Sequence, residues 1–244
     1  MTMIPPLSKV LDVEELRKSV EVLSISKVLE LLLNYDIVAW RLDDLDIYVA
    51  QDIETKNWNF VRISHLIGIS EPKLALEVKF GIKLYGKQQL RRILYGLLVH
   101  QAYQYAISNL LEDAQVEVPV VNNQYKITGR ADIVTRDYVI EIKGGVHNEF
   151  YKYQLGAYML ALNKSKGFLV YKDAVYPIEM NRILRDCIIG KIYELRQVYQ
   201  QILKMDLLTI INKYTYILMN NTKYATEDLV RLLIDNGFLE IRWY

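Results

Sequence analysis

Short apolar segments in the middle of the chain alternate with polar residues in the way that β-strands do. Three such segments follow one another and are bounded by polar turn residues, a pattern that predicts a small sheet. Before them, the apolar spacing around residues 84–111 predicts a long helix. The three predicted strands are Val116–Val121, Gln124–Val134 and Tyr138–Lys143.

The pattern then changes back from strands to helices. Asn148 has the residue type of a helix N-cap, and the helix that it predicts runs to about Asn163. Gly167–Tyr171 and Val175–Met180 form a hairpin-like pair, and residues 181–204 have helical spacing. Strands mixed with helices in this order predict an α/β (α+β mixed) fold, with a mixed sheet flanked by helices.

The same patterning divides the chain into three regions. Residues 1–60 form a helical accessory region, residues 61–204 hold the core, and residues 205–244 form a helix–strand appendage. In the appendage, Gly237 is placed as the residue after a helix, before a strand Phe238–Tyr244.

Composition restricts the class of protein. The chain is 52% hydrophobic and 24% charged, which is typical of a globular protein, and no apolar run approaches the ~18 residues of a membrane span. No secretory signal is recognised at Met1, so we expect an intracellular protein with no membrane partner. Cys187 is the only cysteine, which excludes a disulfide framework and a four-cysteine cluster. The net charge of +1 does not by itself indicate nucleic acid.

The candidate chemistry lies on the second and third predicted strands. The chain has four Glu-x-Lys triplets, but only Glu141 and Lys143 lie in an apolar strand pattern, where a period of two places both on one face. Asp132 ends the preceding strand across a tight connection. Because adjacent strands lie ~4.8 Å apart, the three side chains can converge on one divalent ion. The alternative is a surface strand pair with an ordinary salt bridge.

This set of residues suits hydrolysis of a phosphodiester. Mg²⁺ prefers oxygen ligands at ~2.1 Å, so Asp132, Glu141 and the backbone carbonyl of Ile142 are the predicted metal ligands. Such an ion polarises the phosphate and lowers the pKa of a bound water. Lys143 would orient that water and offset charge that develops in the transition state.

Neighbouring residues extend the candidate site. Gln154 and Tyr158 lie four apart on the following helix, where they can hydrogen-bond a phosphate or order Lys143, or simply pack against the sheet. His100 has the spacing of an inward-facing residue on the long helix, with Gly96 one turn earlier. It is a candidate further metal ligand, better suited to Mn²⁺ than to Mg²⁺, or else a core histidine.

Basic residues recur every four positions before the predicted strands. On a continuous helix they form a stripe that could follow a phosphate backbone, with a solvated helix face as the alternative. Gly81 and Gly86 argue against one continuous helix. Glu117 and Arg130 lie near the site in sequence and are assigned structural roles. The predicted DNA-binding residues are Lys79, Lys83, Lys87 and Arg91.

Taken in order, these motifs resemble the PD-(D/E)XK nuclease superfamily, in particular its RecB-like branch, over roughly residues 90–172. The resemblance implies a restriction-endonuclease-like core, Mg²⁺- or Mn²⁺-dependent catalysis and a DNA substrate. It implies catalytic roles for Asp132, Glu141, Lys143, Gln154 and Tyr158. The matching pairs are Gly96/His100, Gly129/Asp132, Glu141/Lys143 and Gln154/Tyr158.

The chain departs from many members of this branch, because one cysteine cannot hold their iron–sulfur cluster. In this respect it is similar to nuclease-like proteins of spindle-shaped archaeal viruses (fuselloviruses), which would place it in the host cytoplasm. That similarity implies a fold close to archaeal Holliday-junction endonucleases, which act as homodimers.

The sequence therefore supports a deoxyribonuclease acting on replication, recombination or repair intermediates. We favour a structure-selective endonuclease over an end-dependent exonuclease. The alternative is a catalytically silent DNA-binding protein with a nuclease fold, but such a protein would be free to lose one of Asp132, Glu141 and Lys143. A transcription regulator that uses its terminal helix–strand units has the least support.

We predict that the purified protein contains no iron–sulfur cluster, since Cys187 cannot supply four thiolates. The measurements are iron content and visible absorption. Stoichiometric iron together with a visible band would contradict the prediction.

Overall fold

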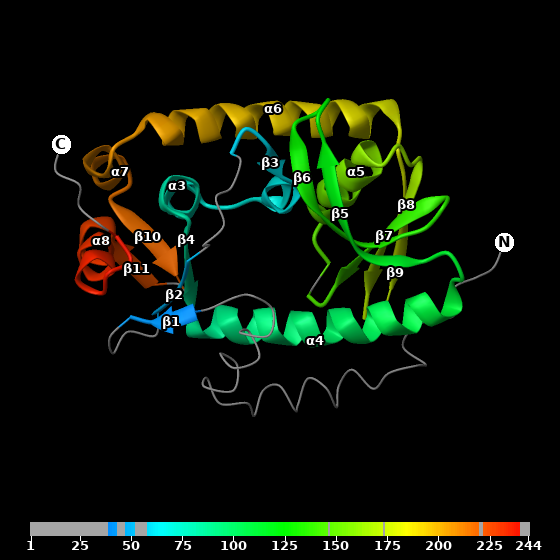
Figure 1. The fold of residues 1–244 in the computed structure, drawn as a ribbon, viewed down its shortest axis with the longest axis horizontal. Coiled ribbons are helices and arrows are strands. Elements are labelled where there is room, and N and C mark those ends of the chain that lie inside the picture. The colour runs from blue at the N-terminus through cyan, green and yellow to red at the C-terminus, as the bar shows by residue number, and fades with distance from the viewer. Residues whose placement is uncertain are drawn as a thin grey trace. The chain divides into compact units, whose positions relative to one another are not determined.

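The computed structural model describes residues 39–42, 47–51, 58–145, 147–172, 174–219 and 222–239. They divide into two compact units (Figure 1). The first comprises residues 59–68 and 95–197, and the second comprises the described residues from 39 to 58, 69–94 and 198–239. The predicted helical region before residue 39 lies outside the described residues, as do residues 240–244 of the last predicted strand.

The first unit contains a mixed six-stranded sheet with the order β3-β6-β7-β8-β9, in which β5 also pairs with β6. The β7–β8 pair is parallel, whereas the β6–β7 and β8–β9 pairs are antiparallel. This mixed sheet confirms the predicted fold class. Its strands are β3 (Val61–Arg62), β5 (Gln115–Asn122), β6 (Ile127–Val134), β7 (Tyr138–Lys143), β8 (Lys166–Tyr171) and β9 (Val175–Glu179).

Strand β6 has an incomplete ladder on one edge. Strand β5 pairs with it along its length, so β3 and β7 share the other edge. On that edge β3 pairs only with residues 127–128, and β7 pairs only with residues 133–134. The sheet therefore opens between β6 and β7 from Asp132 toward the start of β6.

Helices flank this sheet on both faces, as Figure 1 shows for α4 (Lys87–Leu110) on one side and α5 (Tyr151–Ala161) with α6 (Arg182–Lys204) on the other. Directly after β3, η2 (Ile63–Ile67) forms one short helical segment. A buried stripe of α4 packs on the sheet residues that share a face with Ile140 and Ile142. This core consists of Val99, Tyr103, Ala106, Ile107, Ile133, Ile140, Ile142 and Val170.

The start of α5 corrects one prediction. The helix begins at Tyr151, with Phe150 rather than Asn148 as its N-cap residue. Asn148 instead closes the turn before the helix, because its side-chain oxygen accepts from the backbone N–H of Phe150 and its carbonyl from that of Tyr151. Its polar side chain therefore stabilises the turn and not the first helical turn.

The long helix predicted from residue 84 begins later, at Lys87. Residues 82–86 form β4 (Ile82–Gly86), whose buried and half-buried residues alternate and which pairs with β2 (Ile47–Gln51). Helix α3 (Glu71–Phe80) ends just before it at Gly81, in a left-handed conformation with φ of 70°. Pairing with β2 therefore overrides the helical spacing of this segment.

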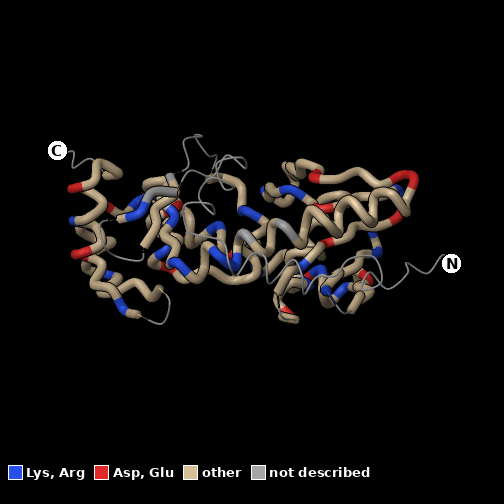
Figure 2. The backbone as a smooth tube through the Cα atoms, turned by 90° about the horizontal axis from the view of Figure 1, so that it is seen from below, with Lys and Arg blue, Asp and Glu red and all other residues tan. Residues whose placement is uncertain are grey.

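The continuous helix that would carry the basic stripe is therefore absent from this described segment. Lys79 lies on α3, Lys83 on β4, and Lys87 and Arg91 on α4. Lys79 donates to the Leu203 carbonyl at 2.8 Å, and Lys83 lies 3.5 Å from the Glu77 carboxylate. Figure 2 shows Lys and Arg on several elements, interspersed with Asp and Glu.

The second unit combines β1 (Ala39–Arg41), β2 and β4 with the C-terminal elements. Its core includes Leu76 of α3, Leu84 of β4 and Leu233 of α8. A hairpin that the sequence did not predict lies between the last two helices. Gly237 follows α8 with φ of 77°, as predicted. The C-terminal elements are α7 (Leu207–Lys213), β10 (Tyr216–Met219), β11 (Thr222–Ala225) and α8 (Thr226–Asp235).

None of the helices in the described part of the chain has the length and apolar character that crossing a membrane requires.

Candidate active site

The candidate site lies where the sheet opens between β6 and β7. The ladder between these strands is paired at Ile133–Ile140 and Val134–Val139. At the next position the Asp132 carboxylate accepts the backbone N–H of Ile142 at 2.6 Å. The N–H and C=O of one strand residue point to the same edge, so the Ile142 carbonyl faces the same opening.

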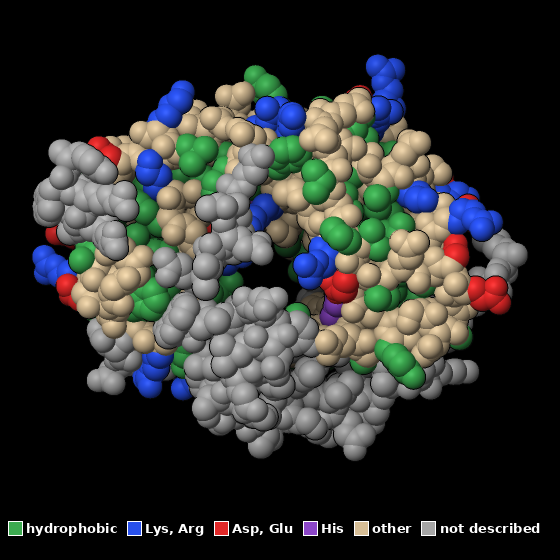
Figure 3. Space-filling view, in the orientation of Figure 1, with side chains coloured by type: hydrophobic (Ala, Val, Ile, Leu, Met, Phe, Trp, Pro, Cys, Tyr) green, Lys and Arg blue, Asp and Glu red, His purple; other side chains and the backbone are tan. Residues whose placement is uncertain are grey.

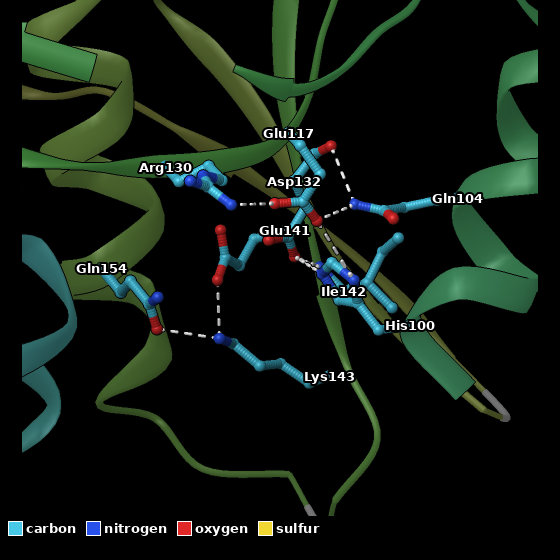
Figure 4. Close-up of polar contacts among 9 residues, drawn as sticks. All are labelled: His100, Gln104, Glu117, Arg130, Asp132, Glu141, Ile142, Lys143 and Gln154. Carbon is cyan, nitrogen blue, oxygen red and sulfur yellow. Dashed lines mark hydrogen bonds and ion pairs between the residues drawn. The ribbon is translucent and has the colours of Figure 1, made fainter. Parts of the chain in front are cut away.

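Glu141 and Lys143 form a buried pair on the α5 side of β7. Lys143 Nζ donates to Glu141 Oε1 at 2.7 Å and to Gln154 Oε1 of α5 at 2.8 Å (Figure 4). The ammonium group also lies 4.5 Å from the centre of the Tyr151 ring. Glu141 is 2% exposed, and its second oxygen, Oε2, has no hydrogen-bond partner. Gln154 therefore accepts a hydrogen bond from the Lys143 ammonium.

Burial and neighbouring charge set the protonation of this pair. Burial and the Asp132 charge raise the pKa of Glu141 to about 7, although Lys143 opposes the shift. For Lys143, burial alone lowers the pKa, but the charges of Glu141 and Asp132 outweigh it and raise the pKa. Lys143 is therefore a persistent cation beside a carboxylate that burial makes costly to ionise.

His100 reaches the same opening from α4, on the opposite face of the sheet. Its Nε2 lies 2.8 Å from Asp132 Oδ2, and its Nδ1 lies 3.6 Å from Glu117 Oε1. Burial alone lowers the pKa of His100, but the hydrogen bond to Asp132 and the nearby carboxylates raise it. His100 is therefore part of the polar cluster around Asp132.

Gln104 and Glu117 also belong to this cluster. Gln104 lies one turn after His100, is buried, and donates from Nε2 to Glu117 Oε1 at 2.5 Å and to the Asp132 carbonyl at 3.2 Å. The side chains of Glu117 and Arg130 are 43% and 69% exposed. Figure 3 shows acidic, basic and histidine side chains adjoining on one face. The cluster is therefore open to solvent on the Glu117 side.

Glycines of the motifs allow close packing around the site. A Cβ on Gly129 would lie 3.0 Å from the Tyr158 hydroxyl oxygen, so Gly129 leaves room for this buried tyrosine. A Cβ on Gly144 would lie 3.1 Å from the Gly96 Cα, whereas one on Gly96 would meet nothing within 4 Å. Helix α4 therefore approaches the chain closely at Gly96, and Gly144 is the residue whose missing side chain permits it.

These residues fit a divalent cation. His100, Glu117 and Asp132 each offer a ligand atom within 4.8 Å of the others. Glu141 adds a buried carboxylate oxygen without a partner. Buried carboxylates are costly unless they are paired or coordinate a metal, and oxygen and imidazole donors together suit Mg²⁺ or Mn²⁺.

Most of the predicted site residues meet in the first unit. They are His100, Asp132, Glu141, Ile142, Lys143, Gln154 and Tyr158. The four predicted DNA-binding residues belong to the second unit. Gln104 and Glu117 were not predicted as site residues. Gln104 could have been found from its place four residues after His100, but Glu117 has no comparable signal.

We predict that Glu141→Gln stabilises the metal-free protein at neutral and alkaline pH. The pKa of Glu141 is raised in the folded state from 4.5 to about 7, so its ionisation lowers the free energy of unfolding as pH rises through this interval. Thermal unfolding in EDTA at pH 5 and pH 8 tests this, and the gap between variant and wild type should widen at pH 8. If the stabilities of variant and wild type change with pH in parallel, the raised pKa of Glu141 in the folded state is contradicted.

No protein-family model matches the chain. It is similar to solved structures, among them an alkaline exonuclease from Laribacter hongkongensis, with 12% identity, a TM-score of 0.48, and coverage of 59% of this chain and 90% of that one. A phage-related exonuclease from Haemophilus somnus 129PT has 14% identity and a TM-score of 0.46, with coverage of 58% of this chain and 94% of that one. The protein SSO0001 has 21% identity and a TM-score of 0.47, with coverage of 78% of this chain and 87% of that one. With TM-scores below 0.5, these likenesses assign no activity to the chain.

Proposed function

We propose that this chain is a divalent-metal-dependent deoxyribonuclease. The observation that carries the proposal is the buried Glu141 carboxylate. Lys143 holds one of its oxygens, and the other has no partner. Asp132 and His100 meet at the same opening in the sheet. A carboxylate pair can hold a divalent ion that assists cleavage of a phosphodiester, and a fixed lysine can offset charge that develops on the phosphate.

The residues that would hold Mg²⁺ or Mn²⁺ are Asp132, Glu141, His100 and the carbonyl of Ile142. When bound, the ion would polarise the phosphate and lower the pKa of a coordinated water. The chain itself supplies a fixed cation, because Glu141 and Gln154 both accept from the Lys143 ammonium. Lys143 would offset negative charge that develops on the phosphate. Gln154 would keep this ammonium in position when substrate binds.

Tyr158 supports the site from the same helix face as Gln154. Hydrogen bonds with Gln154 and with the Arg130 backbone act on its hydroxyl, while burial raises its pKa. The hydroxyl therefore stays protonated near neutral pH and serves as a neutral hydrogen-bonding group. It would orient Gln154, and through it Lys143, rather than transfer a proton.

Within this function we favour DNA of branched structure as the substrate, as part of recombination or repair. The support is the resemblance to the nuclease-like proteins of spindle-shaped archaeal viruses, whereas the RecB-like motifs favour an end-processing exonuclease. A homodimer would place two sites on opposed strands, as symmetric cleavage of a junction requires.

We predict that Lys143→Ala lowers kcat by about 10²–10³-fold while KM changes little, because its charge acts mainly where transition-state charge develops. Lys166→Ala is the matched control, since Lys166 is an exposed lysine on neighbouring β8. Steady-state cleavage of a labelled oligonucleotide measures both constants. A change confined to KM would make Lys143 a phosphate-binding residue only.

We predict that the protein cleaves closed circular and four-way-junction DNA with Mg²⁺ or Mn²⁺ and sediments as a dimer. Labelled linear, circular and junction DNA are incubated with each metal and with EDTA. Digestion of linear ends alone by a monomer would instead indicate an exonuclease. Binding of every DNA without cleavage would indicate a catalytically silent protein.

A further inference from the structure

Glu117 has an unusual backbone conformation beside the candidate site. It lies within β5 and has φ of 52°, in the left-handed region that residues with a Cβ seldom adopt. The β5–β6 ladder pairs Val116 with Ile133 and Val118 with Ala131, and it skips the position where Glu117 faces Asp132. The ladder between β5 and β6 is therefore interrupted at Glu117, opposite Asp132.

The carboxylate of Glu117 is directed toward the site by specific contacts (Figure 4). Gln104 donates to its Oε1 at 2.5 Å and at the same time donates to the Asp132 carbonyl. The same oxygen lies 3.6 Å from His100 Nδ1. Gln104 thus joins Glu117 to the two residues that already meet at the opening.

A plain structural role explains these contacts less well. The ion pair of Glu117 with Arg130 spans 3.9 Å between side chains that are 43% and 69% exposed. Exposed pairs of this length contribute little to stability. A bond to Arg130 therefore gives no reason for a carboxylate to be held against His100 and Asp132, where like charge opposes it.

A cation gives that reason. Ligand atoms of His100, Glu117 and Asp132 lie within 4.8 Å of one another. Donors at ~2.1 Å from one ion lie up to about 4.2 Å apart, so a small adjustment brings all three to a single ion. Independently, the buried Glu141 Oε2 has no partner, and Figure 4 shows the Glu141 carboxylate beside Asp132. An unpartnered buried carboxylate oxygen next to this group of ligand atoms is a second sign of a cation.

We propose that Glu117 is a further ligand of the metal centre, so that β5 contributes to the site together with α4, β6 and β7. This inference rests on the proposed function only in assuming that the opening between β6 and β7 binds a divalent cation. A Glu117 ligand would increase the negative charge around the ion and bring it toward the exposed side of the site.

The test measures Mn²⁺ binding to the DNA-free protein by titration calorimetry. Glu117→Gln should weaken Mn²⁺ affinity by about tenfold or more, within the range found when groups around a metal are altered. Glu179→Gln is the control, because it removes the same charge from an exposed position on β9 of the same sheet. Equal affinities of these two variants would overturn the proposal.

Two further variants separate ligation from the electric field of the charge. Glu117→Asp keeps the charge but shortens the side chain, which withdraws the carboxylate oxygens from the site. If Glu117 is a ligand, this variant binds Mn²⁺ more weakly than the wild type, and an unchanged Mn²⁺ affinity would overturn the proposal. The double variant Arg130→Gln/Glu117→Gln restores the local net charge but does not restore the carboxylate ligand. Ligation predicts that affinity stays low in this double variant, whereas recovery to the wild-type value would show that the field alone was responsible.

The outcomes separate this inference from the proposed function. Wild-type protein that binds Mn²⁺ but cleaves no DNA would remove the nuclease assignment and leave the Glu117 test valid. Loss of Mn²⁺ binding in Glu141→Gln but not in Glu117→Gln would remove only the Glu117 assignment. Wild-type protein that binds no Mn²⁺ would overturn both. A cooperative thermal unfolding transition in EDTA verifies that each variant is folded. If Glu117→Gln is not folded, Glu117→Asp is used in its place.

Discussion

The site depends on one hydrogen bond, the one that Asp132 accepts from the backbone N–H of Ile142 at 2.6 Å. At this position a side chain takes the place of a strand neighbour, so β6 and β7 separate without leaving that N–H unsatisfied. The resulting opening connects the two faces of the sheet. His100 enters it from α4, while Lys143 and Gln154 meet on the α5 side.

An excess of buried negative charge follows from this geometry. Asp132 and Glu141 are both nearly buried, and Lys143 is bound to Glu141. Burial, and after it the Asp132 charge, raises the pKa of Glu141, although Lys143 opposes the shift. Such a cluster lowers the free energy of unfolding of the metal-free protein. A cation that binds only the folded state would raise that free energy again.

Local patterning predicted much of the fold. Strand β7 was predicted with its observed ends, and the β8–β9 hairpin and α6 were predicted to within about a residue. These segments have clear periodicity because each buries one face. Prediction was wrong where a distant partner decides the structure. Residues 84–86 were predicted as helix but belong to β4, which pairs with β2. The hairpin of β10 and β11 shares a core with Leu42, Ile47 and Leu84.

The sequence by itself determined that Glu141 and Lys143 share a strand face, that Asp132 lies on the strand before them, and that Gln154 and Tyr158 share a helix face. Side chains repeat their direction every two residues in a strand and every 3.6 residues in a helix. The spacing of residues in the sequence is therefore enough to predict which side chains share a face. Only the tertiary structure decided that Glu117 joins His100 and Asp132. Its backbone has φ of 52°, and Gln104 holds its carboxylate across a contact between α4 and β5. Such a contact depends on how a helix packs on a sheet, which no residue spacing encodes.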